Sequence, residues 1–150
     1  MPNTLFPVFD VPDVVADDTR EIARYGIAPL FDFEREDFVL NGAGQIVFGT
    51  GHDAWVAWCM KIIATQRWAH LAYSDDIGVE MREVLALSDR RAQESMLERT
   101  ITEALLADPA RRTQQVVDFV FKWGVDVLDI SCMVFGNDGN SAVVNAAIRI

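Results

Sequence analysis

The residues best suited to chemistry lie between positions 65 and 83, where acids, a histidine and a serine are close together. The acids form two pairs, Asp75 with Asp76 and Glu80 with Glu83. Two carboxylates can hydrolyse a glycosidic bond when they lie roughly 5–9.5 Å apart across a cleft and burial raises the pKa of one of them. Adjacent acids at a helix start also have a structural origin, because carboxylates favour helix N-termini. We therefore predict no catalytic residues in this region.

The other polar residues match no metal, nucleophile or phosphate motif. His52 and His70 are far apart, and neither belongs to a His-Glu-x-x-His pattern. Ser74 lies in Tyr-Ser-Asp rather than in the Gly-x-Ser-x-Gly turn of hydrolases. The glycines at 42–44 are too few for a phosphate loop, and residues 137–140 lack the terminal Glu of a calcium loop. The sequence therefore predicts no cofactor and no metal site.

The composition is that of an acidic chain that folds. Hydrophobic residues make up 51% of the 150 residues, and the formal net charge is -10. Nucleic acid phosphates and anionic membrane surfaces repel such a chain, so we expect neither as a partner. The N-terminus lacks the basic start and apolar stretch of a signal peptide, which predicts synthesis in the cytoplasm. Cys59 and Cys132 are therefore expected to be buried free thiols.

The chain divides into an arm and one folded domain. Residues 1–28 combine prolines with acids and have no stable apolar period, so they are expected to form an extended acidic arm. A short helical turn is expected within it at 17–25. The charge of the arm either keeps it solvated or attracts a basic partner surface. Residues 29–150 are expected to form the folded domain.

Three helices are expected in this domain, one beginning between Thr50 and Asp53 and two others spanning 79–87 and 89–107. The first has a wide apolar stripe that includes Trp55, and the hydroxyl of Thr50 is expected to cap it. Ser88 is expected to cap the third helix, and the Asp108-Pro109 pair should end it.

Alternating apolar residues predict the strands at both ends of the domain. An early hairpin is expected, with its turn at Asn41-Gly42, because both residue types accept positive φ. Its strands are expected at 30–33 and 37–48. The strands of a C-terminal meander are expected at 117–123, 125–135 and 143–150. The order predicts an α+β fold with an N-terminal β-hairpin and with two to three helices that pack on one face of an antiparallel β-meander.

Four segments carry a resemblance to a known family. They are FDFEREDFVLNGAG, GHDAWVAWCMKIIATQRWAHLAYSDDIGVEM, ERTITEALLADPA and a Trp-Gly hairpin, and they cover about residues 30–135. The most specific run is Thr65-x-Arg67 followed by residues 71–80. In these segments the chain resembles the baseplate wedge proteins of contractile phage tails and related prophage particles, also called sheath initiators. It looks closest to the branch found in defective Gram-positive prophages.

The resemblance implies a structural role in the tail baseplate of a virion or virion-like particle. Members of the family join the baseplate wedge to the first sheath ring, in six copies per particle. The partners it implies are larger baseplate wedge proteins and the tail sheath protein, with tube or hub proteins as further candidates. Family members offer a sheet that arms of the sheath protein extend by strand addition. Some relatives carry a lysozyme label, so a peptidoglycan-degrading enzyme carried in the baseplate is the alternative function.

Two surfaces of this chain are candidates for that role. Arg67, Tyr73, Asp76 and Glu80 are predicted to form the contact with the wedge core, because a guanidinium suits fixed carboxylate or backbone partners. The alternative is that Arg67 pairs with Asp76 or Glu80 within the monomer and orders the loop.

The second surface is the last strand. An unprotected strand edge is a template for strand addition. The contact with the sheath protein is therefore predicted at Val143, Asn145, Ala147 and Arg149. The alternative is that this strand is internal to the sheet.

Overall fold

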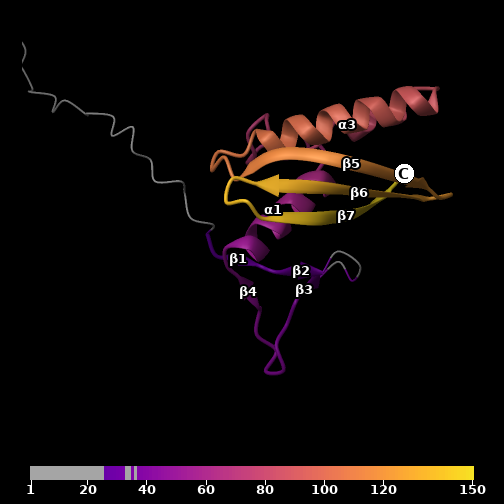
Figure 1. The fold of residues 1–150 in the computed structure, drawn as a ribbon. Helices are drawn as coiled ribbons and strands as arrows, with labels where there is room; N and C mark the ends of the chain where they lie inside the picture. The colour runs from indigo at the N-terminus through magenta and orange to yellow at the C-terminus, as the bar shows by residue number, and fades with distance from the viewer. Residues whose placement is uncertain (1–25, 33–34, 36) are drawn as a thin grey trace, which may run out of the picture.

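The computed structural model describes residues 26–32, 35 and 37–150. The strands and helices follow one another in the order β1 (Ala28–Pro29), β2 (Phe31–Asp32), β3 (Asp37–Phe38), β4 (Phe48–Gly49), α1 (His52–Ala64), α2 (Met81–Leu85), α3 (Arg90–Leu106), β5 (Thr113–Trp123), β6 (Val127–Gly136) and β7 (Ser141–Arg149) (Figure 1). The predicted arm and its helical turn lie outside the described residues, apart from positions 26–28. Within the described residues, no helix combines the length and the apolar character that a membrane crossing requires.

The C-terminal strands form a three-stranded antiparallel meander in the order β5-β6-β7. Helix α1 packs against β7, α3 packs against β5, and the two helices contact each other, so both cover the same face of the sheet (Figure 1). Alternate residues of β6 are buried beneath them, from Leu128 and Ile130 to Cys132 and Val134. The predicted α+β class is therefore confirmed.

A β-bulge in β5 changes the predicted faces of that strand. Phe121 pairs with Ile130 and lies on the helix-covered face, whereas Val117 pairs with Met133 on the opposite face. The register shifts between them, and Asp118 has a positive φ of 55°. An extra residue reverses the alternation, so the simple alternation from Val117 to Trp123 on which the strand at 117–123 was predicted is interrupted at Asp118.

Two of the predicted helix caps also differ. The residue before α1 is Gly51 with a φ of 55°, and no side chain of the described residues caps this helix, so Thr50 does not have the predicted role. Helix α3 begins one residue later than expected, because Asp89 rather than Ser88 accepts the hydrogen bond from Ala92 N. A carboxylate caps the positive helix terminus as well as a hydroxyl does. The helix ends at Leu106, shortly before the predicted stop at Asp108-Pro109.

The N-terminal strands form two short pairs, β1 with β4 and β2 with β3. The chain between β3 and β4 continues as a ribbon that extends away from the meander, where Leu40 pairs with Ile46 (Figure 1). The side chain of Asn41 orders the turn by accepting hydrogen bonds from Ala43 N and Gln45 N, each of 2.9 Å. The hairpin is confirmed, but the positive φ falls at Gly44, which makes it a three-residue loop rather than an Asn-Gly turn.

The centre of the core lies between α1 and the meander. Trp55 is completely buried there, and its indole Nε1 donates a 3.0 Å hydrogen bond to Oγ1 of Thr113 at the start of β5. Buried indole N–H groups need such an acceptor, because an unmade bond in an apolar core is costly. This contact fixes the position of α1 relative to the sheet.

Cys59 on α1 and Cys132 on β6 are buried free thiols, as predicted. Burial raises the pKa of Cys59 from the ordinary value of 9.0 to about 12, and that of Cys132 to about 11. The neutral thiols therefore stabilise the fold below pH 9, and this contribution is lost as the pH rises from 9 towards 11–12.

We expect both thiols to resist alkylation in the native protein. Iodoacetamide needs an accessible thiolate, so at pH 8 the native chain should react at least about 100-fold more slowly than the urea-unfolded chain. Mass spectrometry of timed, quenched samples would measure both rates. Rapid labelling of native Cys59 would contradict the buried position of this residue.

Candidate functional site

The loop between α1 and α2 is closed by hydrogen bonds at its two ends. The strand-like residues Gln66 and Val79 form a parallel bridge, in which Arg67 N donates to Val79 O (3.0 Å) and Val79 N donates to Thr65 O (2.9 Å). Gln66 extends this closure, because its Oε1 accepts a 3.1 Å hydrogen bond from Arg82 N at the start of α2. The ten residues 68–77 are thus held as a closed loop with fixed ends.

Arg67 and Glu80 strengthen the closure from within. Arg67 Nε donates to Gly78 O (3.0 Å), and Arg67 Nη1 donates to Glu80 Oε1 (2.9 Å). Their side chains are only 11% and 16% exposed. A charge-assisted pair at this burial is screened less than a surface pair, so each partner depends on the other. Arg67 lies three residues beyond the end of α1.

Gly78 permits this closure because of its backbone conformation. It has a φ of 98°, and an added Cβ would lie 2.6 Å from Thr65 O and 2.9 Å from Arg67 N. Only glycine fits where two backbone segments approach so closely at positive φ.

Large side chains project from the closed loop. Leu71 is fully exposed, and Trp68 is more than half exposed, with a positive φ of 61°. Tyr73 lies closer to the body of the protein, where its ring contacts His70 and lies 4.9 Å from Lys61 Nζ. Exposed apolar groups on a rigid loop are typical of a protein–protein contact.

The four residues predicted for the wedge contact therefore occupy two positions. Arg67 and Glu80 form the internal pair at the base of the loop, whereas Tyr73 and Asp76 lie on its exposed part. Of the two monomer pairings considered for Arg67, the structure contains the one with Glu80. Within the described residues, Asp76 forms no ion pair.

The acids considered for catalysis are exposed or paired in the described structure. Asp75, Asp76 and Glu83 are exposed, and the carboxylate of Glu80 is bound to Arg67. Among the described residues, no three His, Cys, Asp or Glu side chains are placed to hold a metal ion. The arrangement of these residues is suited to holding a loop in shape.

The second surface is the outer edge of β7. Hydrogen bonds from Gly136 N to Asn140 O (2.8 Å) and from Ile150 N to Asp126 O (3.0 Å) close the two ends of the β6–β7 ladder. In an antiparallel pair, bonded residues alternate with residues whose N–H and C=O groups point away. The even-numbered residues from 142 to 148 therefore bond to β6, while Val143, Asn145 and Ala147 point their backbone groups away from it.

The strand β7 is thus at the edge of the sheet. Within the described part of the chain, no other strand pairs with its outer side. The side chains of Val143, Asn145 and Ala147 lie on the face of the meander opposite the helices, and Arg149 has the same register position. The four residues predicted for the sheath contact therefore share one face of one edge strand.

The two edges of the meander differ in regularity. Strand β5 carries the bulge at Asp118 and the charged residue Lys122, both of which hinder the approach of another strand. Strand β7 pairs with β6 without a shift from Arg149 to Ser141. A regular edge is the better template for strand addition, so β7 is the stronger candidate.

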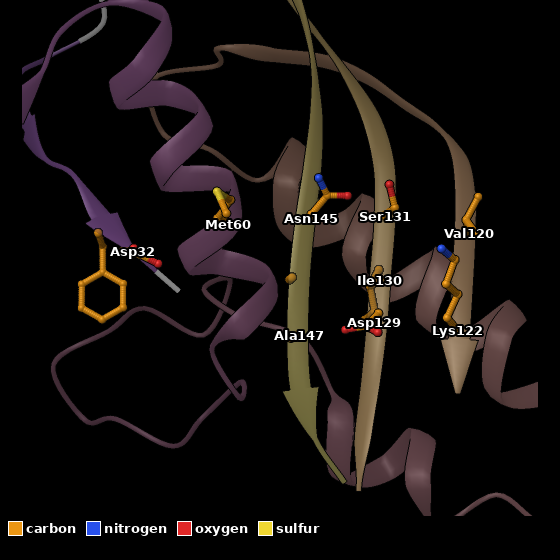
Figure 2. Close-up of a pocket in the computed structure, with 11 residues that line it drawn as sticks. Asp32, Met60, Val120, Lys122, Asp129, Ile130, Ser131, Asn145 and Ala147 are labelled. Atoms are coloured by element: carbon orange, nitrogen blue, oxygen red, sulfur yellow. The ribbon is translucent and has the colours of Figure 1, made fainter. Parts of the chain in front are cut away.

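A cavity of about 560 Å³ lies beside β7 (Figure 2). Its lining includes Asn145 and Ala147 from one face of the strand and Ala146 from the other face, so it extends around the strand edge. Met60 of α1 and Phe31 and Asp32 of β2 line the far side, and Figure 2 shows Met60 on α1 beside β7. The open edge therefore faces a hollow that α1 and β2 border on its far side.

Sequence reasoning missed several of these residues. Gly78 lies within the run of residues 71–80 that resembles the family. Its role depends on the close approach of its backbone to that of Thr65 and Arg67, which only the fold reveals. The sequence places Trp68 and Leu71 in the segment that resembles the family, but it gives no sign that their side chains are exposed. Met60 and Phe31 are far from β7 in sequence, and no local pattern joins them to it.

The loop and the open edge belong to a domain that matches a known family. Residues 28–141 match the family described as contractile injection system sheath initiator. A search of curated proteins found no match. The match covers α1, the closed loop and the meander as far as the first residue of β7. This chain belongs to the sheath initiator family of contractile injection systems.

Proposed function

We propose that this chain joins the wedge core of a contractile-tail baseplate to the first sheath ring, and that it starts sheath assembly by accepting a strand at β7. The observation that carries the proposal is the regular, open edge of β7 beside a cavity. Membership of the sheath initiator family supports contact with sheath and baseplate components. Each backbone N–H and C=O pair on the edge can bind an incoming strand without a particular side chain.

The wedge core contacts the closed loop in this proposal. Arg67 and Glu80 hold the loop, and the surface around Tyr73 and Asp76, together with Trp68 and Leu71, meets the larger wedge proteins. A preformed loop loses little conformational freedom on binding, which favours assembly. Six copies per particle are expected, one for each wedge. The domain is proposed to span residues 29–150, with the acidic arm before it.

The wedge half of the proposal is tested by Leu71→Asp. Leu71 is fully exposed, so the substitution should change the free energy of unfolding by less than about 0.5 kcal/mol. A carboxylate in an apolar contact should reduce co-purification with the wedge proteins by at least about tenfold. Pull-down from cells expressing the wedge proteins, with quantification on gels, would measure the loss.

Val125→Asp is the matched control. Val125 is also highly exposed, at 93%, but lies in the turn between β5 and β6, away from the loop. This variant should co-purify normally. Equal recovery of both variants and of the unchanged chain would exclude the loop as the wedge contact.

A further inference from the structure

The cavity beside β7 has two chemically different sides. On the helix-covered side, an incoming strand would meet the half-buried side chain of Met60, with Phe31 and Asp32 of β2 beyond it. On the other side, it would lie next to Asn145 and Ala147, which belong to cross-strand rows with Ser131 and Asp129. One side is therefore mainly apolar, although the carboxylate of Asp32 is also part of its lining, and the other side is mixed, with polar and charged side chains.

Strand geometry converts this difference into a sequence requirement. Successive side chains of a strand point to opposite faces, and a strand added to β7 would lie about 4.8 Å from it. Its alternate side chains would then face α1, and the intervening ones would face the open side of the sheet. A side chain that faces α1 is removed from water by Met60 and Ala146, which favours apolar residues.

We infer that the β7 edge selects an amphipathic strand, with apolar residues at every second position facing Met60 and neutral or basic residues between them. This inference rests on the proposed strand addition at β7, and it specifies which sequences the added strand can have. Backbone hydrogen bonds alone would bind any extended peptide segment. Contact with Met60 would favour a segment in which apolar residues occupy every second position over one in which they do not. The formal net charge of -10 disfavours an acidic segment.

Two synthetic peptides would test the inference on the full chain. One is a nine-residue peptide with alternating Val and Thr and a Lys at each end. The other has the same composition, with the Val residues in adjacent pairs. Because each apolar side chain that is buried is worth about tenfold in affinity, we expect the alternating peptide to bind at least about tenfold more tightly. Fluorescence anisotropy with labelled peptides would measure both dissociation constants.

Matched methionine variants would show which side chain causes the preference for the alternating peptide. Met60→Gln should remove most of the preference for the alternating peptide, whereas Met96→Gln should retain it. Both methionines are half-buried on helices, but Met96 lies on α3 and away from this cavity. Thermal unfolding of both variants would show whether either substitution changes the fold, and Met60→Thr would replace Met60→Gln if that variant unfolds.

The outcomes separate this inference from the proposal on which it rests. Equal binding of the two peptides, lost in Asn145→Pro, would overturn the selection by Met60 but leave strand addition at β7 intact. Peptide binding that persists unchanged in Asn145→Pro would overturn strand addition itself. A preference that is the same in Met60→Gln and in the unchanged chain would also contradict the inference.

Discussion

Asn145→Pro should abolish sheath assembly on the baseplate while the domain stays folded. The backbone N–H of Asn145 points away from β6, so proline removes a donor that β6 does not use. Proline is tolerated on edge strands for the same reason, and native proteins use it there to block further pairing. We expect recruitment of the sheath protein to fall to less than about a tenth, because a Pro in the middle of the edge interrupts a short strand pair.

Negative-stain electron microscopy of particles assembled with this variant would count the baseplates that carry a sheath. Asn145→Thr is the control, since it changes the side chain but keeps the N–H group, and it should support normal assembly. Wedge co-purification should be unchanged in both variants. Sheaths of normal number and length on Asn145→Pro baseplates would rule out strand addition at this position.

Gly78→Ala should strongly destabilise the closure of the loop between α1 and α2. The methyl group would lie 2.6 Å from Thr65 O, and alanine would have to adopt a φ of 98°. We expect a loss of roughly 2–4 kcal/mol in the free energy of unfolding, which combines conformational strain with displacement of the Gln66–Val79 bridge. Urea titration followed by circular dichroism would measure it, and the midpoint of thermal unfolding should fall by roughly 5–15 °C.

Two other glycines separate the causes of this loss. Gly139 has a φ of 81° but open space around it, so Gly139→Ala should cost only about 1 kcal/mol through its conformation. Gly42 has neither constraint, and Gly42→Ala should be close to neutral. If Gly78→Ala were no worse than Gly139→Ala, the close approach of the two backbone segments would not be what orders the loop.

Much of the fold was predictable because the apolar periods are strong. The spacing of apolar residues predicts a strand at 125–135 and the stripe around Trp55 in α1, and in the structure Leu128, Ile130 and Cys132 are buried on one face of β6. The bulge at Asp118 was not predictable, because an extra residue in a strand leaves no mark in the sequence until its partner is known. The observed cap of α3 is one residue later than the predicted one, because Ser88 and Asp89 are both residue types that suit a helix N-cap.

The candidate surfaces were predictable to a smaller extent. The sequence indicated a polar loop and a weakly protected last strand, and the structure contains both, while the contacts assigned to them stay predictions. It could not show that Arg67 pairs with Glu80 rather than Asp76, since both acids are at reachable separations in a loop. It also could not join Met60 to β7, because that contact surface depends on the packing of α1 against the sheet.

The most direct test of strand addition is amide hydrogen exchange, resolved by residue, in the chain alone and with the sheath protein bound. In the free chain, the amides of Val144 and Ala146 should exchange slowly and those of Val143, Asn145 and Ala147 quickly, because only the even-numbered residues bond to β6. Binding of the sheath protein should slow the three odd-numbered amides by at least about 100-fold. Slow exchange of these three amides in the free chain, or no change on binding, would contradict the account.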